Sequence, residues 1–167
     1  MILALMVSIS FSGLPAQLES KARTAIADVA KAKSALSAGN STSSQSWLAK
    51  AEGLLSSVLG QVPGGDLLKK GDKAGSGQPG AVSQAESEVA KVDPSLAGKL
   101  GIAKQKAAQG DTNGASSAVA DAKGDAAQKT GLGELADIYQ KVTSAQTLLK
   151  AGENSKAKNL LDEIPLR

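Results

Sequence analysis

Apolar residues recur every three or four positions along most of this chain, and that spacing restricts what it can fold into. Residues so spaced lie along one face of an α-helix, whereas a strand would place them at every second position. The clearest stripe lies in residues 134–151 and contains Leu135, Ile138, Tyr139, Val142, Ala145, Leu148 and Leu149. Another, in residues 19–38, contains Ala22, Ala25, Ile26, Val29, Ala32 and Leu36. The pattern predicts an all-α fold.

Gly, Pro and Ser/Thr residues interrupt these stripes and set the predicted helix ends. Gly39 ends the first helix because glycine tolerates the left-handed conformation found after a helix. Asp93 followed by Pro94 is typical of an N-cap and a first helical position. Further helices are expected over about 43–59, 82–91, 94–109, 115–128 and 155–164, which gives about six to seven in total. Val119 is the only large apolar residue in 115–128, so this helix is expected to pack weakly.

One pattern repeats around three glycines, Gly39, Gly110 and Gly152. A polar residue follows each glycine, a small residue lies five positions after it, and apolar residues lie nine positions after and three before. These residues are Asn40, Asp111 and Glu153; Ser44, Ala115 and Ala157; Leu48, Val119 and Leu161; and Leu36, Ala107 and Leu149. Each copy of this pattern predicts an αα-hairpin in which the small residue lets the second helix approach the turn. Irregular spacing favours a compact bundle of αα-hairpins with Gly-polar turns over a regular solenoid.

The segment from about 60 to 81 is rich in Gly and Pro and has no period. We expect a long loop there, with Leu67 and Leu68 as its only apolar anchors, inside a single helical domain of residues 17–167. Within it, residues 71–80 are Gly-rich but lack the order of a phosphate-binding loop, which favours a flexible linker.

The residue types available limit the chemistry of this chain. It has no His and no Cys, which excludes Ser-His-Asp and Cys-His catalysis and most zinc, copper and haem sites. We therefore expect a protein that is not an enzyme and uses no metal or cofactor. The net charge is only +3, and the one Lys-Lys pair is Lys69–Lys70. With few aromatic residues for base stacking, this charge pattern predicts no nucleic-acid partner.

The N-terminal 18 residues carry no charged side chain. Residues 1–16 are predicted to be a signal peptide, with a small-residue cleavage zone around Gly13 to Ala16 and a mature chain beginning near Gln17. The expected location is the periplasm, without stable membrane insertion after processing. Two alternatives remain open, a buried N-terminal helix and an uncleaved membrane anchor formed by residues 1–18.

Trp47 and Tyr139 are the candidate contact residues. Each lies on a predicted apolar stripe, so core packing is the favoured interpretation, and contact with a ligand or an unfolded client is the alternative. Three polar motifs are attributed to helix structure. Asp111 to Gly114 lacks the spacing of a calcium loop. Glu86 and Glu88 point to different helix faces, and Glu134 with Asp137 lies in a first helical turn where carboxylates are favourable.

The hairpin layout resembles a known family. The second half reads AKQKAAQGDTNGASSAVADAKGDA and then TGLGELADIYQKVTSAQTLLKAGENSKAKNLLDEI, and the first half contains AKSALSAGNSTSSQSWLAKAEGLLSSVLGQVP. Over about residues 20–164 this succession of helices, Gly-polar turns and Leu-Leu helix ends resembles the YfdX family of bacterial exported helical proteins. The chain departs from that layout in its Gly-rich stretch at 71–80 and its leucine-poor helix at 115–128.

The resemblance implies a periplasmic protein associated with tolerance to heat and similar stress. It also implies a homo-oligomer that binds small molecules or unfolded proteins, and no catalytic residues are carried over with it. Three other functions remain as alternatives: an assembly subunit that retains its apolar N-terminus as an oligomerisation helix, a largely disordered desiccation protectant, and an enzyme. The strong stripes in 43–59 and 134–151 argue against the disordered protectant.

Overall fold

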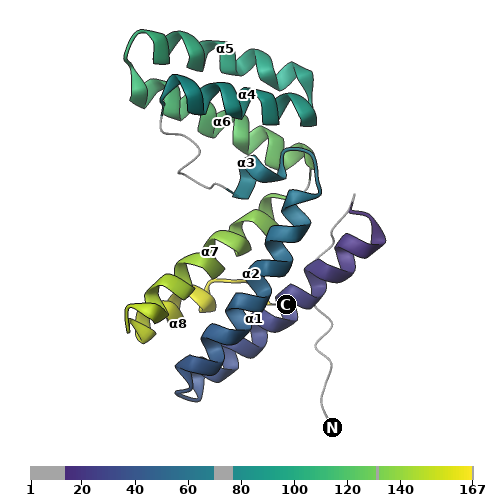
Figure 1. Ribbon diagram of the computed structural model, residues 1–167, viewed down its shortest axis with the longest axis vertical. Helices are drawn as coiled ribbons and strands as arrows, with labels where there is room; N and C mark the ends of the chain where they lie inside the picture. Colours follow the sequence, from purple (N-terminus) through teal and green to yellow (C-terminus); the bar gives the residue numbers. More distant parts are fainter. Residues whose placement is uncertain (1–13, 70–76, 131, 167) are drawn as a thin grey trace. The chain divides into compact units, whose positions relative to one another are not determined.

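The computed structural model describes residues 14–69, 77–130 and 132–166, and every regular element in those residues is a helix (Figure 1). The helices are α1 (Ala16–Ser37), α2 (Ser41–Gly60), α3 (Gly65–Lys69), α4 (Pro79–Val92), α5 (Pro94–Ala108), α6 (Thr112–Thr130), α7 (Gly133–Lys150) and α8 (Asn154–Asp162). Apart from the five-residue α3, each observed helix end lies within three residues of its predicted position. The expected all-α fold of about six to seven helices is confirmed in the described residues, which form seven longer helices besides the five-residue α3. Most of the predicted signal peptide lies outside the described residues.

The helices group into two compact units. Unit 2 is the continuous segment Leu59–Ala136, and unit 1 combines the described chain up to Val58 with the chain from Asp137 onward. Unit 1 therefore contains α1, α8 and most of α2 and α7, whereas unit 2 contains α3 to α6. The residues predicted to form a single domain, 17–167, include both units.

The three predicted Gly-polar turns have the same backbone geometry. The φ angles of Gly39, Gly110 and Gly152 are 81°, 80° and 77°. In each turn the glycine N–H donates to the carbonyl three residues earlier, and the next N–H donates to the carbonyl five residues earlier, at 2.9 to 3.1 Å. This is the Schellman motif, which satisfies carbonyls left free at a helix end. A residue with a Cβ would be strained at this φ by about 1–2 kcal/mol, so glycine is favoured.

The repeated positions around these turns are buried in all three hairpins. Ser44, Ala115 and Ala157 have no exposed surface, and their small size lets the second helix lie close to the turn. The residues nine positions after and three positions before each glycine are also buried: Leu48, Val119, Leu161, Leu36, Ala107 and Leu149. The predicted αα-hairpins are therefore confirmed as α1–α2, α5–α6 and α7–α8.

Unit 1 packs the α1–α2 hairpin with the α7–α8 hairpin. Its buried side chains include Ile26, Val29, Leu48, Leu55, Ile138, Val142 and Leu161. The α1 and α8 helices contact each other, and Lys33 Nζ on α1 lies 3.1 Å from Asp162 Oδ1 on α8. Hydrogen bonds from Lys158 and Lys33 lower the pKa of the Asp162 carboxyl. The two ends of the described chain thus meet in one core.

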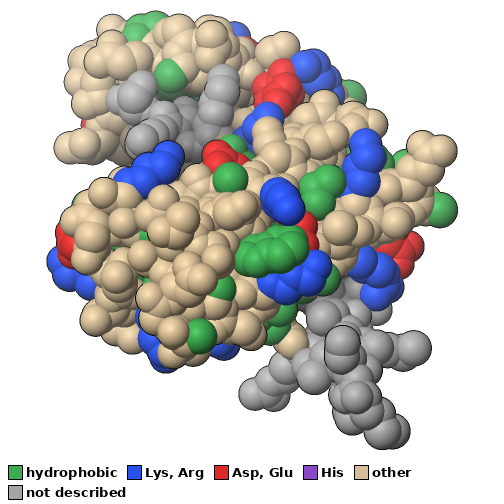
Figure 2. Space-filling view, turned by 60° about the horizontal axis from the view of Figure 1, so that its bottom comes forward, with side chains coloured by type: hydrophobic (Ala, Val, Ile, Leu, Met, Phe, Trp, Pro, Cys, Tyr) green, Lys and Arg blue, Asp and Glu red, His purple; other side chains and the backbone are tan. Residues whose placement is uncertain are grey.

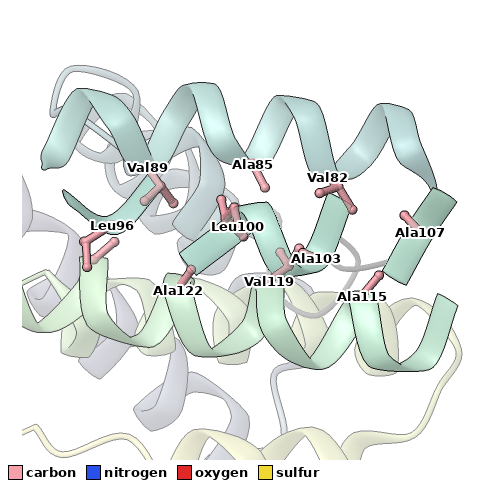
Figure 3. Packing of buried hydrophobic residues seen from close by; sticks show 11 residues of the cluster. Val82, Ala85, Val89, Leu96, Leu100, Ala103, Ala107, Ala115, Val119 and Ala122 are labelled. Carbon is pink, nitrogen blue, oxygen red and sulfur yellow. The ribbon is translucent and has the colours of Figure 1, made fainter. Parts of the chain in front are cut away.

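Unit 2 encloses a core made from α4, α5 and α6, whose labelled side chains point toward one another in Figure 3. Leucines and valines of α4 and α5 pack with an alanine-rich face of α6, on which Ala115, Val119, Ala122 and Ala126 are all buried. The small side chains of α6 bury this face completely, although Val119 is its only large apolar residue. Ion pairs also link the helices, from Lys104 to Glu86 and from Lys99 to Asp125.

The segment predicted as a long loop is partly helical. Leu68 on α3 is buried, α3 contacts α4 and α6 within unit 2, and Pro79 opens α4 from inside the predicted loop range. Proline favours this first helical position because its missing N–H has no helical partner there. A methyl group at Gly65 would overlap the carbonyl oxygen of Leu59, so the chain approaches itself closely before α3. The remaining part, residues 70–76, and the Leu67 side chain lie outside the described residues.

Candidate interaction surface

Trp47 lies on α2 of unit 1 and is half-buried. The ammonium nitrogens of Lys31 and Lys50 each lie 4.4 Å from the centroid of its ring. Lys50 is three residues further along α2, where a helix places a neighbour on the same face. Lys31 comes from α1, and the turn explains its position: Lys31 is eight residues before Gly39 and Trp47 is eight residues after it.

The two lysines beside Trp47 differ in whether an acidic side chain pairs with them. Lys31 Nζ lies 3.3 Å from an oxygen of Asp28, a buried carboxylate one turn earlier on α1. Lys50 is exposed, and no acidic side chain of the described chain forms an ion pair with it. Because both ammonium nitrogens are 4.4 Å from one centroid, they are no more than twice that distance apart. This separation is about one Debye length at physiological salt, so an approaching anion experiences both charges.

Trp47 with its two lysines can bind a partner in two ways. The exposed part of the indole offers apolar area, and the ammonium groups, each attracted to the ring by about 0.5–1 kcal/mol, retain donors for an anion. Leu54 is two turns further along α2 and is also half-buried, and Gly53 between them is exposed. Figure 2 shows the hydrophobic side chains of one face in small areas, the largest of which borders Lys or Arg side chains.

Tyr139, on α7, is half-buried and contacts a different set of residues. Its hydroxyl shares a hydrogen bond with the Ser56 side chain, and Glu52 lies nearby, so the ring lies between α7 and α2 of unit 1. Burial raises the pKa of Tyr139 above its usual value, and the negative charge of Glu52 raises it further, while the Ser56 hydrogen bond opposes both. Trp47 and Tyr139 are both half-buried, so each packs partly into unit 1 and keeps part of its surface exposed.

Two buried polar atoms of unit 1 have no hydrogen-bond partner among the residues that the structure describes. They are Ser44 Oγ, in a side chain with no exposed surface, and Gln146 Nε2, in a side chain that is 8% exposed. Ser44 occupies the small position of its hairpin, where the other two hairpins have alanine. Sequence reasoning selected Ser44 for its size and did not identify Gln146.

The polar motifs attributed to helix structure have structural partners. Asp111 Oδ1 accepts a hydrogen bond from the Gly114 N–H at 2.9 Å, so it caps α6. Glu86 pairs with Lys104, whereas Glu88 pairs with Lys91 of its own helix, as expected for carboxylates on different faces. Asp137 pairs with Lys141 one turn later.

None of the described helices is long and apolar enough to cross a membrane. In the same part of the chain, no three acidic residues come together in a group that could hold a metal ion.

The model of the family described as YfdX protein matches residues 25–164, which include all of the helices from α2 to α8 and most of α1. No curated protein and no solved structure matches the chain significantly.

Proposed function

We propose that this chain, which belongs to the YfdX family, is an exported, non-catalytic protein that supports stress tolerance by binding small molecules or unfolded proteins through helical surface. The periplasm is its proposed location, and a homo-oligomer is its proposed state. The surface formed by Trp47, Lys31 and Lys50 (the Trp47 surface) is the proposed contact region.

The observation that carries this proposal is the partial exposure of Trp47. A tryptophan loses a large apolar area from water when it is buried, so an exposed ring is a favourable place for a partner to bind. In this chain the only Trp lies partly at the surface although other large apolar residues nearby, such as Leu48 and Leu55, are fully buried. The absence of His and Cys and the uncharged N-terminal segment support a non-catalytic, exported protein.

Aggregation of reduced insulin tests the binding function. The reductant that starts insulin aggregation leaves this chain unchanged because it contains no Cys. Insulin has no tryptophan, so indole emission reports Trp47 alone. We expect the protein to slow light scattering in proportion to its concentration, and the Trp47 emission to shift as the ring becomes covered.

Two variants locate the contact. Trp47→Ala should raise the concentration needed for half-suppression by about fivefold, a typical effect of truncating an aromatic contact residue. Ile102→Ala is the matched control because Ile102 is an exposed apolar residue of unit 2, 57% exposed. Unchanged scattering with the wild-type protein would refute client binding, and equal losses in the two variants would refute the assignment to the Trp47 surface.

Mass spectrometry of fractionated bacterial cells tests the proposed location. A periplasmic chain that begins near Gln17 is the expected result. A full-length chain in a large assembly would contradict export and would support the assembly-subunit alternative.

A further inference from the structure

We propose that the Trp47 surface selects acidic unfolded segments, in which Asp or Glu residues flank an aromatic or aliphatic residue. This inference rests on the proposed function and specifies the chemistry of its client. It follows from the charges and the apolar area that the α1–α2 hairpin brings to one ring.

The electrostatic part of the argument starts from the hairpin. Residues 16–60 carry five basic and three acidic side chains, a net charge of +2. Asp28 is the acidic residue placed near Trp47 by its ion pair with Lys31, and it offsets part of the Lys31 charge. Glu19 pairs with Arg23 at 2.7 Å, Asp28 pairs with Lys31, and Glu52 lies beside Tyr139. Lys50 therefore faces the indole with its charge uncompensated by an ion pair among the described residues.

The apolar part of the argument comes from α2. The exposed positions of α2 from Ser46 to Gly53 are Ser46, Ala49, Lys50 and Gly53, and none of them is acidic. No atom lies within 4 Å of the position that a Gly53 Cβ would take, so a chain can approach the helix closely there. An apolar side chain placed against Trp47 would set carboxylates beside it within reach of the two ammonium groups. A basic segment would meet repulsion at the same place.

The test compares two fluorescein-labelled, unstructured peptides with identical apolar residues and spacing, one with Glu and the other with Lys at every charged position. Fluorescence anisotropy with the full-length protein measures both dissociation constants. We expect the acidic peptide to bind at least about fivefold more tightly, because Lys50 can pair with its carboxylates while Lys50 and Lys31 repel the basic peptide. Raising the salt concentration should reduce this preference.

The variant with both Lys31→Gln and Lys50→Gln should bring the ratio of the two dissociation constants close to one. Lys156→Gln together with Lys21→Gln is the control, because it removes the same charge from exposed positions on α8 and α1. Circular dichroism checks the helicity of every variant, because Lys31→Gln removes the ion-pair partner of the buried Asp28 carboxylate although the substituted side chains are themselves exposed.

Separate outcomes distinguish the two proposals. If both peptides bind equally and Trp47→Ala weakens both, the proposed function stands and the selectivity is refuted. A preference that survives the Lys31 and Lys50 substitutions would also refute it, as would displacement of the acidic peptide by a much tighter single-stranded oligonucleotide. If neither peptide binds and insulin aggregation is unaffected, both proposals are wrong.

Discussion

Two glycines of the α1–α2 hairpin should respond with opposite sign to the same substitution. Gly53 is inside α2 and exposed, with an ordinary helical φ, whereas Gly39 forms the turn with φ 81°. At both positions nothing lies within 4 Å of where a Cβ would be, so steric space does not distinguish them. Only the backbone conformation does.

The expected magnitudes follow from that difference. Gly53→Ala should raise the free energy of unfolding by about 0.5–1 kcal/mol, because alanine loses less conformational entropy on entering a helix. Gly39→Ala should lower it by about 1–2 kcal/mol, because a left-handed backbone strains a residue with a Cβ. Gly39→Asn should cost less than Gly39→Ala, since asparagine tolerates this conformation better.

Urea unfolding followed by Trp47 fluorescence measures these changes where they occur, because Trp47 lies in the same hairpin and is the only Trp. A shift of the midpoint with an unchanged slope would report stability alone. Circular dichroism provides the parallel signal from both units. If Gly39→Ala left the stability unchanged, or if Gly53→Ala lowered it, backbone conformation would not be the cause of the difference, and the reasoning would be refuted.

Further predictions concern Ser44 and Tyr139 of unit 1 and the matching small position Ala115 of unit 2. Ser44→Ala should raise the free energy of unfolding by about 1 kcal/mol in urea titrations, because it removes a buried hydroxyl without a partner, and the reverse change Ala115→Ser should lower it by about 1–2 kcal/mol. Tyrosinate absorbance, which reports Tyr139 alone, should show its pKa above the ordinary value of 10.0, and Glu52→Gln should lower it. Because the pKa is raised in the folded state, this stabilisation is complete below about pH 10 and is lost as pH rises through the folded pKa, so Tyr139→Phe should flatten the alkaline part of the stability profile.

The helices and turns could be predicted because their causes are local. For example, Gly110 and the capping carboxylate of Asp111 determine one turn through hydrogen bonds to residues no more than five positions away. The apolar stripes depend on spacing alone, so the buried faces of α1, α5 and α6 follow from the sequence. The three hairpins could also be aligned with one another, because each has similar residue types at the same distances from its turn glycine.

The contact surface could not be predicted in full because it depends on pairing between helices. Lys50 could have been associated with Trp47 from their spacing on one helix. Lys31 can be recognised as a neighbour of Trp47 only when Gly39 is known to be the turn, because the two residues are equally far from Gly39 on the two helices of the hairpin. The half-burial of Tyr139 depends on packing between α7 and α2, which are separated in sequence by all of unit 2.

The composition of unit 1 has a consequence for the order of events during synthesis. Its first hairpin is made early, but the α7–α8 hairpin that completes its core follows only after residues 59–136. At 5–20 residues per second this interval is roughly 4–16 s. Unit 2 is continuous and has all its helices available before α8 is made. Until translation supplies α7 and α8, Leu48 and Leu55 lack part of their native surroundings. Unit 1 therefore contains the first helices to be made, yet its core is completed after that of unit 2.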